Sequence, residues 1–355
     1  MKVVIAAGAS GGHIFPGIAV AEEFRSRSSS YEVIFVGTGK ELERSILSGT
    51  DFCLASVPER AVKGRGLKGL FKLAFSLPKA IKATKKLYKN FQPDVVIGFG
   101  GYPSFVPVFT AWLMGIPRVL HEQNLKVGLA NKFLSLISSK TFSVPGAKGF
   151  LKGKPVEIYN PVRKSFYDAS NFVEPQKESF VLTVCGGSQG AKEVNSAIIE
   201  LVPLFKKYGI SLIHQTGKLD FERVSQAYKD ADFEALKVCS FIDNMVDVYS
   251  GSHLVVSRAG AMSVAEITAS QRPAIYIPLE LAGGHQRDNV CAVVDAGGAE
   301  VIYSGPELAR RLSDALERIF KEPSRLSTMV QSLQSLRSDS RPCEVIVNEV
   351  VKLAA

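Results

Sequence analysis

Four glycine-rich turns, each directly after a short apolar run, are the segments of this 355-residue chain best suited to chemistry. They lie at residues 8–12, 98–101, 186–190 and 258–261. Glycine lets the backbone approach a ligand closely, and the helix after such a turn presents unpaired N–H groups at the positive end of its dipole. One such turn is weak evidence, but four of them, shared between both halves of the chain, predict a ligand that carries phosphate groups.

The sequence argues against a dinucleotide as that ligand. Residues 8–13 read GASGGH, which does not fit the G-x-G-x-x-G pattern of NAD and FAD sites. The second predicted strand ends in GTG at 37–39, where those sites carry an acidic residue for the ribose. A G-x-x-x-x-G-K-[ST] loop for nucleoside triphosphates is absent as well.

His13 follows the first turn, at the carboxyl end of a predicted strand, which is where open α/β sheets bind ligands. Imidazole titrates near neutral pH, so His13 is a candidate general base. A packing or helix-capping histidine is the alternative.

Polar side chains gather at the end of another predicted strand, where residues 121–124 read HEQN and predict recognition of substrate hydroxyls. Glu266, on the helix that follows the fourth turn, is suited to bind two adjacent hydroxyls of a ribose. Gln286 and Asn289 are three residues apart on one helical face and could bind sugar hydroxyls. A polar surface loop and solvated helix faces are the alternatives.

The sequence gives little indication of a metal site. Asp230-Ala231-Asp232 resembles the aspartate pair that holds a divalent ion in some sugar transferases, but its charged helical surroundings are typical of a solvated face. The five cysteines are scattered and lack a C-x-x-C pair, which argues against zinc and disulfides and favours a reducing cytoplasm.

The elements that must position these residues alternate between strand and helix patterns, which predicts an α/β fold with parallel sheets covered on both faces. The same unit of strand, glycine turn and helix begins at residue 3 and again, half of the chain later, at residue 181. We therefore predict two doubly wound domains, joined in the proline-dotted stretch 145–175. The predicted strands are Val3–Ala7, Val33–Val36, Val95–Phe99, Arg118–His121, Val181–Val184, Ile210–His214, Leu254–Ser257 and Ala274–Ile277.

The net charge of +9 comes from one segment, because residues 60–89 contain ten basic residues and no acidic one. Leucine and phenylalanine alternate with lysine at 63–78, a pattern that favours an anionic membrane surface. Nucleic acid is the rival partner, but no nucleic-acid-binding motif follows, and a solvated helix is the third possibility. The uncharged stretch 95–117 is long enough to span a bilayer, but its glycines and prolines predict a buried strand and helix instead.

In combination, these motifs closely resemble the MurG family of glycosyltransferases, which add N-acetylglucosamine to the lipid-linked muramoyl-pentapeptide precursor of peptidoglycan. The resemblance covers nearly the whole chain. It rests on GGH at 11–13, GGY at 100–102, HEQN at 121–124, NPVR at 160–163, GGSQG at 186–190 and RAGA at 258–261. The chain departs from the family at 8–10, where GAS replaces a common Gly-Gly-Thr.

The resemblance implies the GT-B fold, which consists of two Rossmann-like doubly wound parallel-sheet domains facing a cleft. Residues 1–162 would form the acceptor- and membrane-binding domain and residues 163–340 the UDP-sugar-binding domain. Residues 341–355 would form a C-terminal helix that packs back on the first domain.

The family's site residues carry over to matching positions. His13 would be the catalytic base, with Glu122 as its alternative, and Gly101, Tyr102 and His121 would bind the acceptor. The segment at 10–12 and Asn124, assigned to the donor, would also line the acceptor's path. The donor set comprises Ser10, Gly11, Gly12, Asn124, Arg163, Ser188, Ile242, Ala261, Met262, Ser263, Val264, Ala265, Glu266, Gln286 and Asn289.

The implied reaction is inverting transfer of N-acetylglucosamine from UDP-N-acetylglucosamine to the C4 hydroxyl of the undecaprenyl-linked muramoyl-pentapeptide. No metal or other cofactor would be required, because backbone N–H groups and helix dipoles can stabilise the leaving diphosphate. The expected location is peripheral, on the cytoplasmic face of the plasma membrane, without nucleic acid as a partner. A UDP-N-acetylglucosamine epimerase or a lipid glycosyltransferase of the same fold, and a non-enzymatic nucleotide sensor, are the alternatives.

Overall fold

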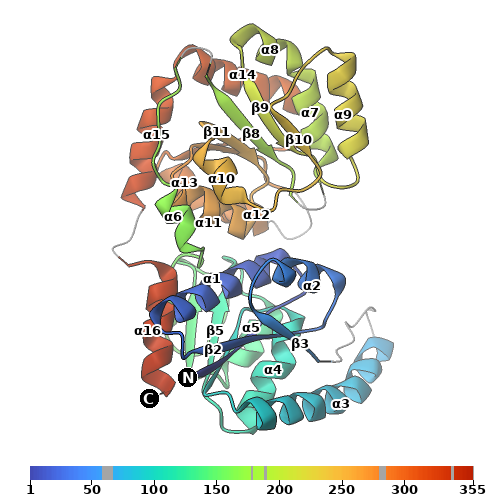
Figure 1. The fold of residues 1–355 in the computed structure, drawn as a ribbon, viewed down its shortest axis with the longest axis vertical. Helices are drawn as coiled ribbons and strands as arrows, with labels where there is room; N and C mark the ends of the chain where they lie inside the picture. The colour runs from blue at the N-terminus through green and yellow to red at the C-terminus, as the bar shows by residue number, and fades with distance from the viewer. Residues whose placement is uncertain (58–66, 177–178, 188–189, 280–284, 337–339, 355) are drawn as a thin grey trace. The chain divides into compact units, whose positions relative to one another are not determined.

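The computed structural model divides the chain into two compact units, each built around one parallel sheet (Figure 1). Unit 1 comprises Met1–Arg163 and Ser340–Ala355, and unit 2 comprises Lys164–Asp339. The structure describes residues 1–57, 67–176, 179–187, 190–279, 285–336 and 340–354, except for the side chains at 67–76 and 285.

Unit 1 contains a seven-stranded parallel sheet in the order β3-β2-β1-β4-β5-β6-β7. The strand order reverses beside β1, which is where open α/β sheets bind ligands. Its strands are β1 (Lys2–Ala6), β2 (Glu32–Gly37), β3 (Cys53–Ser56), β4 (Val95–Gly98), β5 (Arg118–Glu122), β6 (Lys140–Ser143) and β7 (Val156–Glu157). Its helices are α1 (Gly11–Arg27), α2 (Glu41–Ser48), α3 (Leu67–Phe91), α4 (Tyr102–Leu113), α5 (Leu129–Ser135) and α16 (Pro342–Ala354).

The central strand β1 is buried on both faces, which explains why it is apolar throughout its length. Val3 and Ile5 pack into a core with residues of α1 and α16. Val4 and Ala6 point to the opposite face and pack with residues of α3, α4 and α5. Alternation of successive side chains therefore gives unit 1 two cores, one on each side of the sheet.

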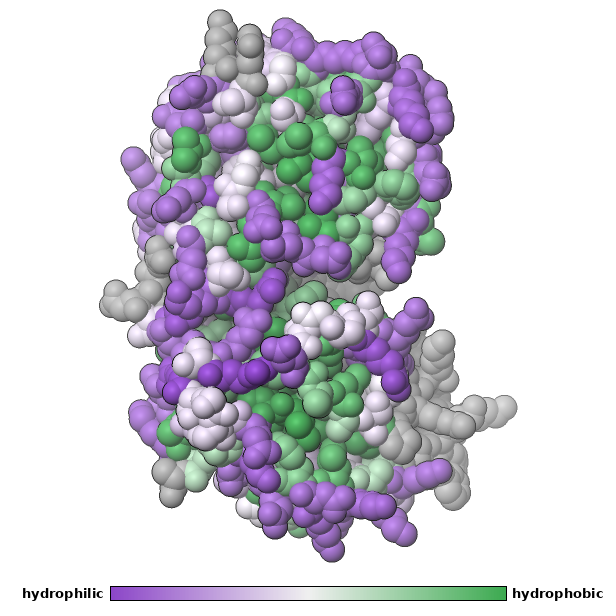
Figure 2. All heavy atoms as spheres, viewed as in Figure 1, coloured by the Kyte–Doolittle hydropathy of each residue, from purple (hydrophilic) through white to green (hydrophobic). Residues whose placement is uncertain are grey.

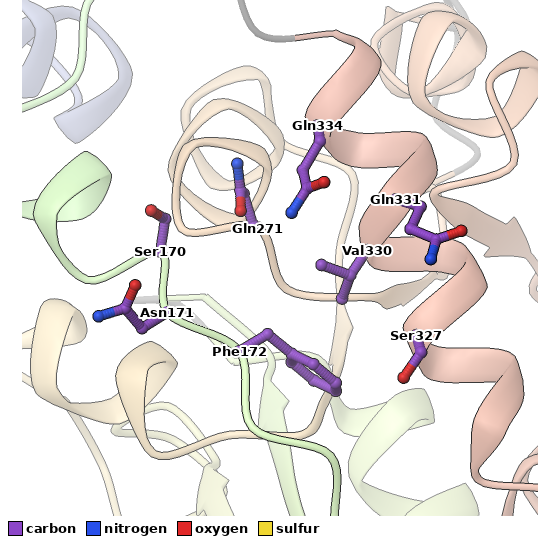
Figure 3. Close-up of a pocket in the computed structure, with 8 residues that line it drawn as sticks. All are labelled: Ser170, Asn171, Phe172, Gln271, Ser327, Val330, Gln331 and Gln334. Atoms are coloured by element: carbon purple, nitrogen blue, oxygen red, sulfur yellow. The ribbon is translucent and has the colours of Figure 1, made fainter.

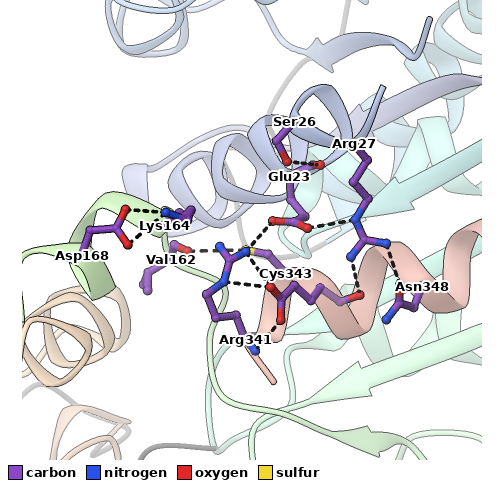
Figure 4. A network of polar contacts seen from close by, with 10 residues as sticks. Glu23, Ser26, Arg27, Val162, Lys164, Asp168, Arg341, Cys343 and Asn348 are labelled. Carbon is purple, nitrogen blue, oxygen red and sulfur yellow. Dashed lines mark hydrogen bonds and ion pairs between the residues drawn. The ribbon is translucent and has the colours of Figure 1, made fainter. Parts of the chain in front are cut away.

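Helix α16 brings the end of the chain back onto α1 (Figure 4). The buried Glu23 of α1 receives hydrogen bonds from Arg27, at 2.9 Å, and from Arg341, at 3.2 Å. Arg341 also donates to Glu344 on α16, and Arg27 donates to Asn348. Because a buried carboxylate is costly without charged partners, this network ties the two helices together in addition to their apolar contact.

Unit 2 contains a six-stranded parallel sheet in the order β10-β9-β8-β11-β12-β13, which repeats the reversal of unit 1 between β8 and β11. Its strands are β8 (Val181–Cys185), β9 (Ser211–Gln215), β10 (Lys237–Cys239), β11 (Leu254–Ser257), β12 (Ala274–Tyr276) and β13 (Ala299–Val301). Its helices are α6 (Lys164–Asp168), α7 (Lys192–Glu200), α8 (Val202–Tyr208), α9 (Phe221–Asp230), α10 (Met245–Ser250), α11 (Ala261–Ala269), α12 (His285–Asp288), α13 (Cys291–Asp295), α14 (Leu308–Lys321) and α15 (Ser324–Ser335).

Hydrophilic and hydrophobic residues are interspersed on the visible face of each unit (Figure 2). In the part of the chain that the structure describes, no helix has the length and apolar character needed to cross a bilayer. The uncharged stretch at 95–117 forms strand β4 and helix α4, as predicted.

Candidate active site

The first glycine turn joins β1 to α1 and carries His13 in the first turn of that helix. Nδ1 of His13 lies 2.9 Å from the hydroxyl oxygen of Ser10, the residue that precedes α1. Gly101 lies against the imidazole, since a Cβ atom there would sit 3.2 Å from Nε2. The backbone of Gly101 has φ +72°, which side chains rarely adopt. Glycine at 101 thus permits the close approach to the ring.

The burial of His13 favours a neutral ring. Burial lowers the pKa of His13, and the charge of Glu122 and the carbonyl of Gly8 oppose that shift. In the tautomer in which Nδ1–H donates to the Ser10 hydroxyl, Nε2 is the nitrogen that can accept a proton. A neutral imidazole with a preset orientation is what a general base requires.

Glu43 of α2, which was not predicted from the sequence, holds the first glycine turn in place. Its carboxylate is 1% exposed and accepts hydrogen bonds from the N–H of Ala9 (3.0 Å), the hydroxyl of Thr38 (2.8 Å) and the N–H of Gly39 (2.7 Å). Ala9 has φ +67°, a conformation that costs free energy in a residue other than glycine. The three donors occupy the carboxylate and fix the loop that leads to His13.

Glu122 organises the loop after β5 and is poorly placed to act as a base. Its carboxylate is 2% exposed and accepts bonds from the backbone N–H groups of Asn124 and Gly128, at 3.0 and 2.9 Å. The side-chain amides of Asn124 and Asn131 donate to it as well. Four donors around a buried carboxylate leave little access for a substrate proton, so the structure does not favour Glu122 as the alternative base. Asn131, which the sequence analysis missed, is a buried amide on α5.

His121, which is predicted to bind the acceptor, has a side chain enclosed within unit 1, so the contact stays a prediction. The ring is fully buried, packs against Phe99 at 5.8 Å between centroids, and neither nitrogen has a hydrogen-bond partner among the described residues. Along β5, His121 and Glu122 point to opposite faces of the sheet, and both side chains are buried. Tyr102 begins α4, directly after Gly101, and is half-buried.

In unit 2, the fourth glycine turn leads into α11, which starts at Ala261 and includes Met262, Ser263 and Ala265. The first N–H groups of a helix have no partner within it, so this end suits an anion. Val264 is the exception, because its N–H donates to the carbonyl of Gly260 and its side chain is buried. The side chain and N–H of Val264 are thus engaged within unit 2, and its donor contact stays a prediction. The side chain of Met262 is also buried, which leaves only its backbone available.

The remaining donor residues lie around the same strand ends of unit 2. Asn289 donates to the carbonyl of Ala259 at 3.0 Å, and Gln286 accepts from the N–H of Leu279 at 2.9 Å. Glu266, half-buried on α11, lies close enough to influence Cys185 at the end of β8. The side chain of Ile242 is buried, and its backbone forms no hydrogen bond with another described residue.

The last two predicted donor residues are Ser188 and Arg163. Ser188 lies outside the described residues. Arg163 ends the first stretch of unit 1, one residue beyond the predicted boundary, and its charge lies near Glu22 of α1. The carbonyl of the preceding Val162 accepts a hydrogen bond from the Cys343 thiol of α16, which keeps this part of the chain on unit 1.

Among the described residues, no group of three or more His, Cys, Asp or Glu side chains could hold a metal ion. Asp230 and Asp232, the pair considered in the sequence, are exposed, and Asp230 accepts a hydrogen bond from Gln226 on its own helix.

Comparison with protein families gives two matches that together cover most of the chain. Residues 3–143 match the glycosyltransferase family 28 N-terminal domain, and residues 181–340 match the glycosyltransferase family 28 C-terminal domain. These segments contain the parallel sheets of unit 1 and unit 2 respectively.

Curated relatives of similar length share one name, UDP-N-acetylglucosamine--N-acetylmuramyl-(pentapeptide) pyrophosphoryl-undecaprenol N-acetylglucosamine transferase. The protein from Syntrophus aciditrophicus is 37% identical over 341 residues, which are 95% of this chain and 94% of that one. The protein from Geobacter sulfurreducens is 36% identical over 364 residues, covering 99% of this chain and 98% of that one.

Solved structures of other proteins also resemble this chain. The crystal structure of Acinetobacter baumannii MurG matches 99% of both chains with a TM-score of 0.75 and 26% identity. A UDP-GlcNAc 2-epimerase from Neisseria meningitidis, bound to UDP-GlcNAc, matches with a TM-score of 0.65, but its 16% identity indicates a shared fold alone. The two Rossmann-like units therefore form the predicted GT-B fold.

Proposed function

Because the chain belongs to glycosyltransferase family 28, we propose that it transfers N-acetylglucosamine from UDP-N-acetylglucosamine to an undecaprenyl-linked muramoyl-pentapeptide. The observation that carries the proposal is the full-length identity of 36–37% with transferases named for this reaction. The reaction is a step of peptidoglycan synthesis, and the product is the lipid-linked disaccharide.

In the proposed step, the C4 hydroxyl of the muramoyl sugar attacks the anomeric carbon of the donor. A new C–O bond forms while the bond from that carbon to the diphosphate breaks, so that UDP leaves from the opposite face and the configuration inverts. Nε2 of His13 takes the hydroxyl proton. The nearby carboxylate of Glu122 then stabilises the imidazolium, as the direction of its effect on the His13 pKa indicates.

Charge that develops on the leaving diphosphate needs stabilisation in the transition state. The N-terminal turn of α11, with the N–H groups of Ala261, Met262 and Ser263, is suited to that work. Glu266 on the same helix would bind the ribose, and the free backbone groups of Ile242 would bind the uracil. We propose that no metal or other cofactor is required, since these groups supply the stabilisation.

We also propose that unit 1 binds the anionic cytoplasmic face of the plasma membrane peripherally, through an apolar surface on α5. Leu129, Phe133 and Leu136 are 74%, 63% and 46% exposed and lie on one helical face, at spacings of four and three. Phe150 is 57% exposed, and its segment is tied to α5 by hydrogen bonds from Lys152 to Ser135 and Leu136. We call these four apolar residues the α5 patch.

Lysines lie near the α5 patch and on helix α3 of the same unit, and positive charge is what an anionic surface requires. Lys132 lies within α5, and its side chain is close to Gly149. Lys126 and Lys148 form a β-bridge beside the patch. Helix α3 adds four exposed lysines opposite its buried face, at Lys79, Lys82, Lys86 and Lys89. Lys63 and the side chains of Lys68 and Lys72 lie outside the part of the chain that the structure describes. Each lysine near an anionic surface contributes about 1 kcal/mol.

The decisive experiment supplies radiolabelled UDP-N-acetylglucosamine together with a lipid-linked muramoyl-pentapeptide analogue. We expect a labelled disaccharide and one equivalent of UDP. An isomerised sugar formed without the acceptor would instead identify an epimerase, and binding of UDP without turnover would identify a nucleotide sensor. Either result would overturn the proposal.

A further inference from the structure

Unit 2 contains a cavity of about 680 Å³ that shares no lining residue with the candidate active site (Figure 3). It lies between the segment after α6 and helix α15, with the end of α11 behind it. Its volume falls in the range of roughly 300–1,000 Å³ that is typical of small-molecule sites. Its lining consists of Ser170, Asn171, Phe172, Gln271, Ser327, Val330, Gln331 and Gln334.

One face of α15 forms a side of the cavity. Four residues of α15 line the cavity: Ser327, Val330, Gln331 and Gln334. The last three follow Ser327 by three, four and seven positions, which places all four on the same helical face. The apolar residues Leu326, Met329 and Leu333 of the same helix are buried in the protein. Helix α15 therefore anchors itself with one face and presents hydroxyl and amide groups to the cavity with another.

Gln271, on the floor of the cavity, is the residue that points most directly to a ligand. It is only 6% exposed, yet its side-chain amide forms no hydrogen bond with any described residue. Its backbone has φ +53°, a conformation that costs free energy in a residue other than glycine. The amide atoms of Gln271 are not buried away from solvent, so they are available to hydrogen-bond a ligand in the cavity.

The opposite wall is held rigidly by Arg272, which is 1% exposed. Its guanidinium donates to the carbonyls of Ala169 and Asn171, at 2.9 and 2.8 Å, and lies 5.7 Å from the centre of the Phe172 ring. The ring edge of Phe172 also contacts His253, at 6.3 Å between centroids. The wall is thus preorganised, which reduces the cost of binding.

The lining determines the class of ligand. None of the eight side chains is charged, and the amides and hydroxyls both donate and accept hydrogen bonds. Arg272 is not among the lining residues, and its Nε and Nη2 groups donate to backbone carbonyls. A purely apolar ligand would leave Gln271 unpaired. A sugar fits both requirements, because its hydroxyls match the amides and its C–H face matches an aromatic ring.

We propose that this cavity is a second binding site, for a neutral saccharide. The site does not depend on the proposed transfer reaction. The test measures binding of N,N′-diacetylchitobiose to the full chain by saturation-transfer NMR and calorimetry, with UDP present at saturation so that a nucleotide-sugar site is occupied.

Two variants keep the test independent of folding. Gln271→Gly removes the amide and also relieves the left-handed backbone, so it should retain stability and weaken saccharide binding about tenfold. Gln334→Ala lies on an exposed position of α15, where alanine favours the helix, and should weaken binding as well. Thr328→Ala, exposed on α15 but absent from the lining, is the matched control and should bind normally.

Three results would overturn the inference. They are no binding by the unaltered chain, unchanged binding by both cavity variants, and binding that occurs without UDP but is lost when UDP is saturating. Because no acceptor is present and no turnover is measured, failure here is separate from failure of the proposed transferase activity.

Discussion

The carboxylate of Glu43 accepts a hydrogen bond from the backbone N–H of Ala9, with 3.0 Å between Oε1 and the nitrogen. Two elements that are far apart in sequence meet in this contact, since Glu43 lies on α2 and Ala9 precedes α1. The contact fixes Ala9 in its left-handed conformation and thereby sets the position of Ser10 and His13. Glu43 is a positioning residue in this arrangement, because it acts on the base through the backbone.

Glu43→Gln should lower kcat about tenfold while leaving KM for UDP-N-acetylglucosamine nearly unchanged. The amide nitrogen of glutamine would face an N–H donor in place of an oxygen, and a hydrogen bond to a charged group contributes about 1.5–3 kcal/mol. Steady-state kinetics measures the effect. Glu41→Gln, at an exposed position of the same helix, is the matched control and should behave like the unaltered chain. Full turnover by Glu43→Gln would contradict the positioning role.

His13→Ala should reduce turnover about 10²–10⁴-fold, the range for loss of a general base, and leave UDP affinity unchanged. The pH dependence provides a second measurement. Burial lowers the pKa of His13 below its ordinary 6.5, so the ring stays neutral and kcat/KM should remain level as the pH falls to about 6.5. A loss of activity that begins well above pH 6.5, or a fully active His13→Ala, would assign the base elsewhere.

The sequence predicted the fold well because parallel strands buried on both faces are continuously apolar. All eight predicted strands are present, as β1, β2, β4, β5, β8, β9, β11 and β12. The five described strands that were not predicted give weak sequence signals. For example, β7 has only two residues. Strands β3 and β13 lie at the edges of their sheets and contain polar or small residues.

The site was only partly predictable. The glycine turns and His13 could be identified because their chemistry depends on local sequence. Glu43 could not, because its role depends on the pairing of β1 with β2, and its neighbours resemble a solvated helix start. The polar motif at 121–124 also did not reveal that its first three residues, His121, Glu122 and Gln123, are buried. The sequence pattern shows which residues are polar, whereas their burial is decided by the sheet.

The buried His121 should make unit 1 lose stability in acid. Burial lowers the pKa of His121 to about 3, whereas the unfolded chain binds a proton near 6.5. The unfolded state therefore holds more protons than the folded state below pH 6.5. The free energy of unfolding should fall with decreasing pH, and His121 should contribute about 1.4 kcal/mol per pH unit to that fall. His121→Leu should remove that part of the slope.

Urea unfolding between pH 7.5 and 4.5 tests this prediction. Trp112 is the only tryptophan of the chain and belongs to unit 1, so its fluorescence reports on the unit that contains His121. His253→Leu, in unit 2, is the control and should leave the slope of the Trp112 transition unchanged. An equal slope for His121→Leu and the unaltered chain would show that His121 is not the group responsible.

Membrane binding should depend on the α5 patch together with its lysines. Leu129→Ser combined with Phe133→Ser should reduce sedimentation with phosphatidylglycerol vesicles at least tenfold, since each large apolar side chain contributes about 1.5–3 kcal/mol when fully buried. Leu219→Ser with Leu236→Ser is the matched control, because these unit 2 residues are 87% and 62% exposed and should not affect binding. High salt or phosphatidylcholine vesicles should weaken binding of the unaltered chain, because the lysine contribution is electrostatic. Equal losses in both pairs of variants would mean that binding reflects general surface hydrophobicity, and no loss in either would place the membrane contact outside α5.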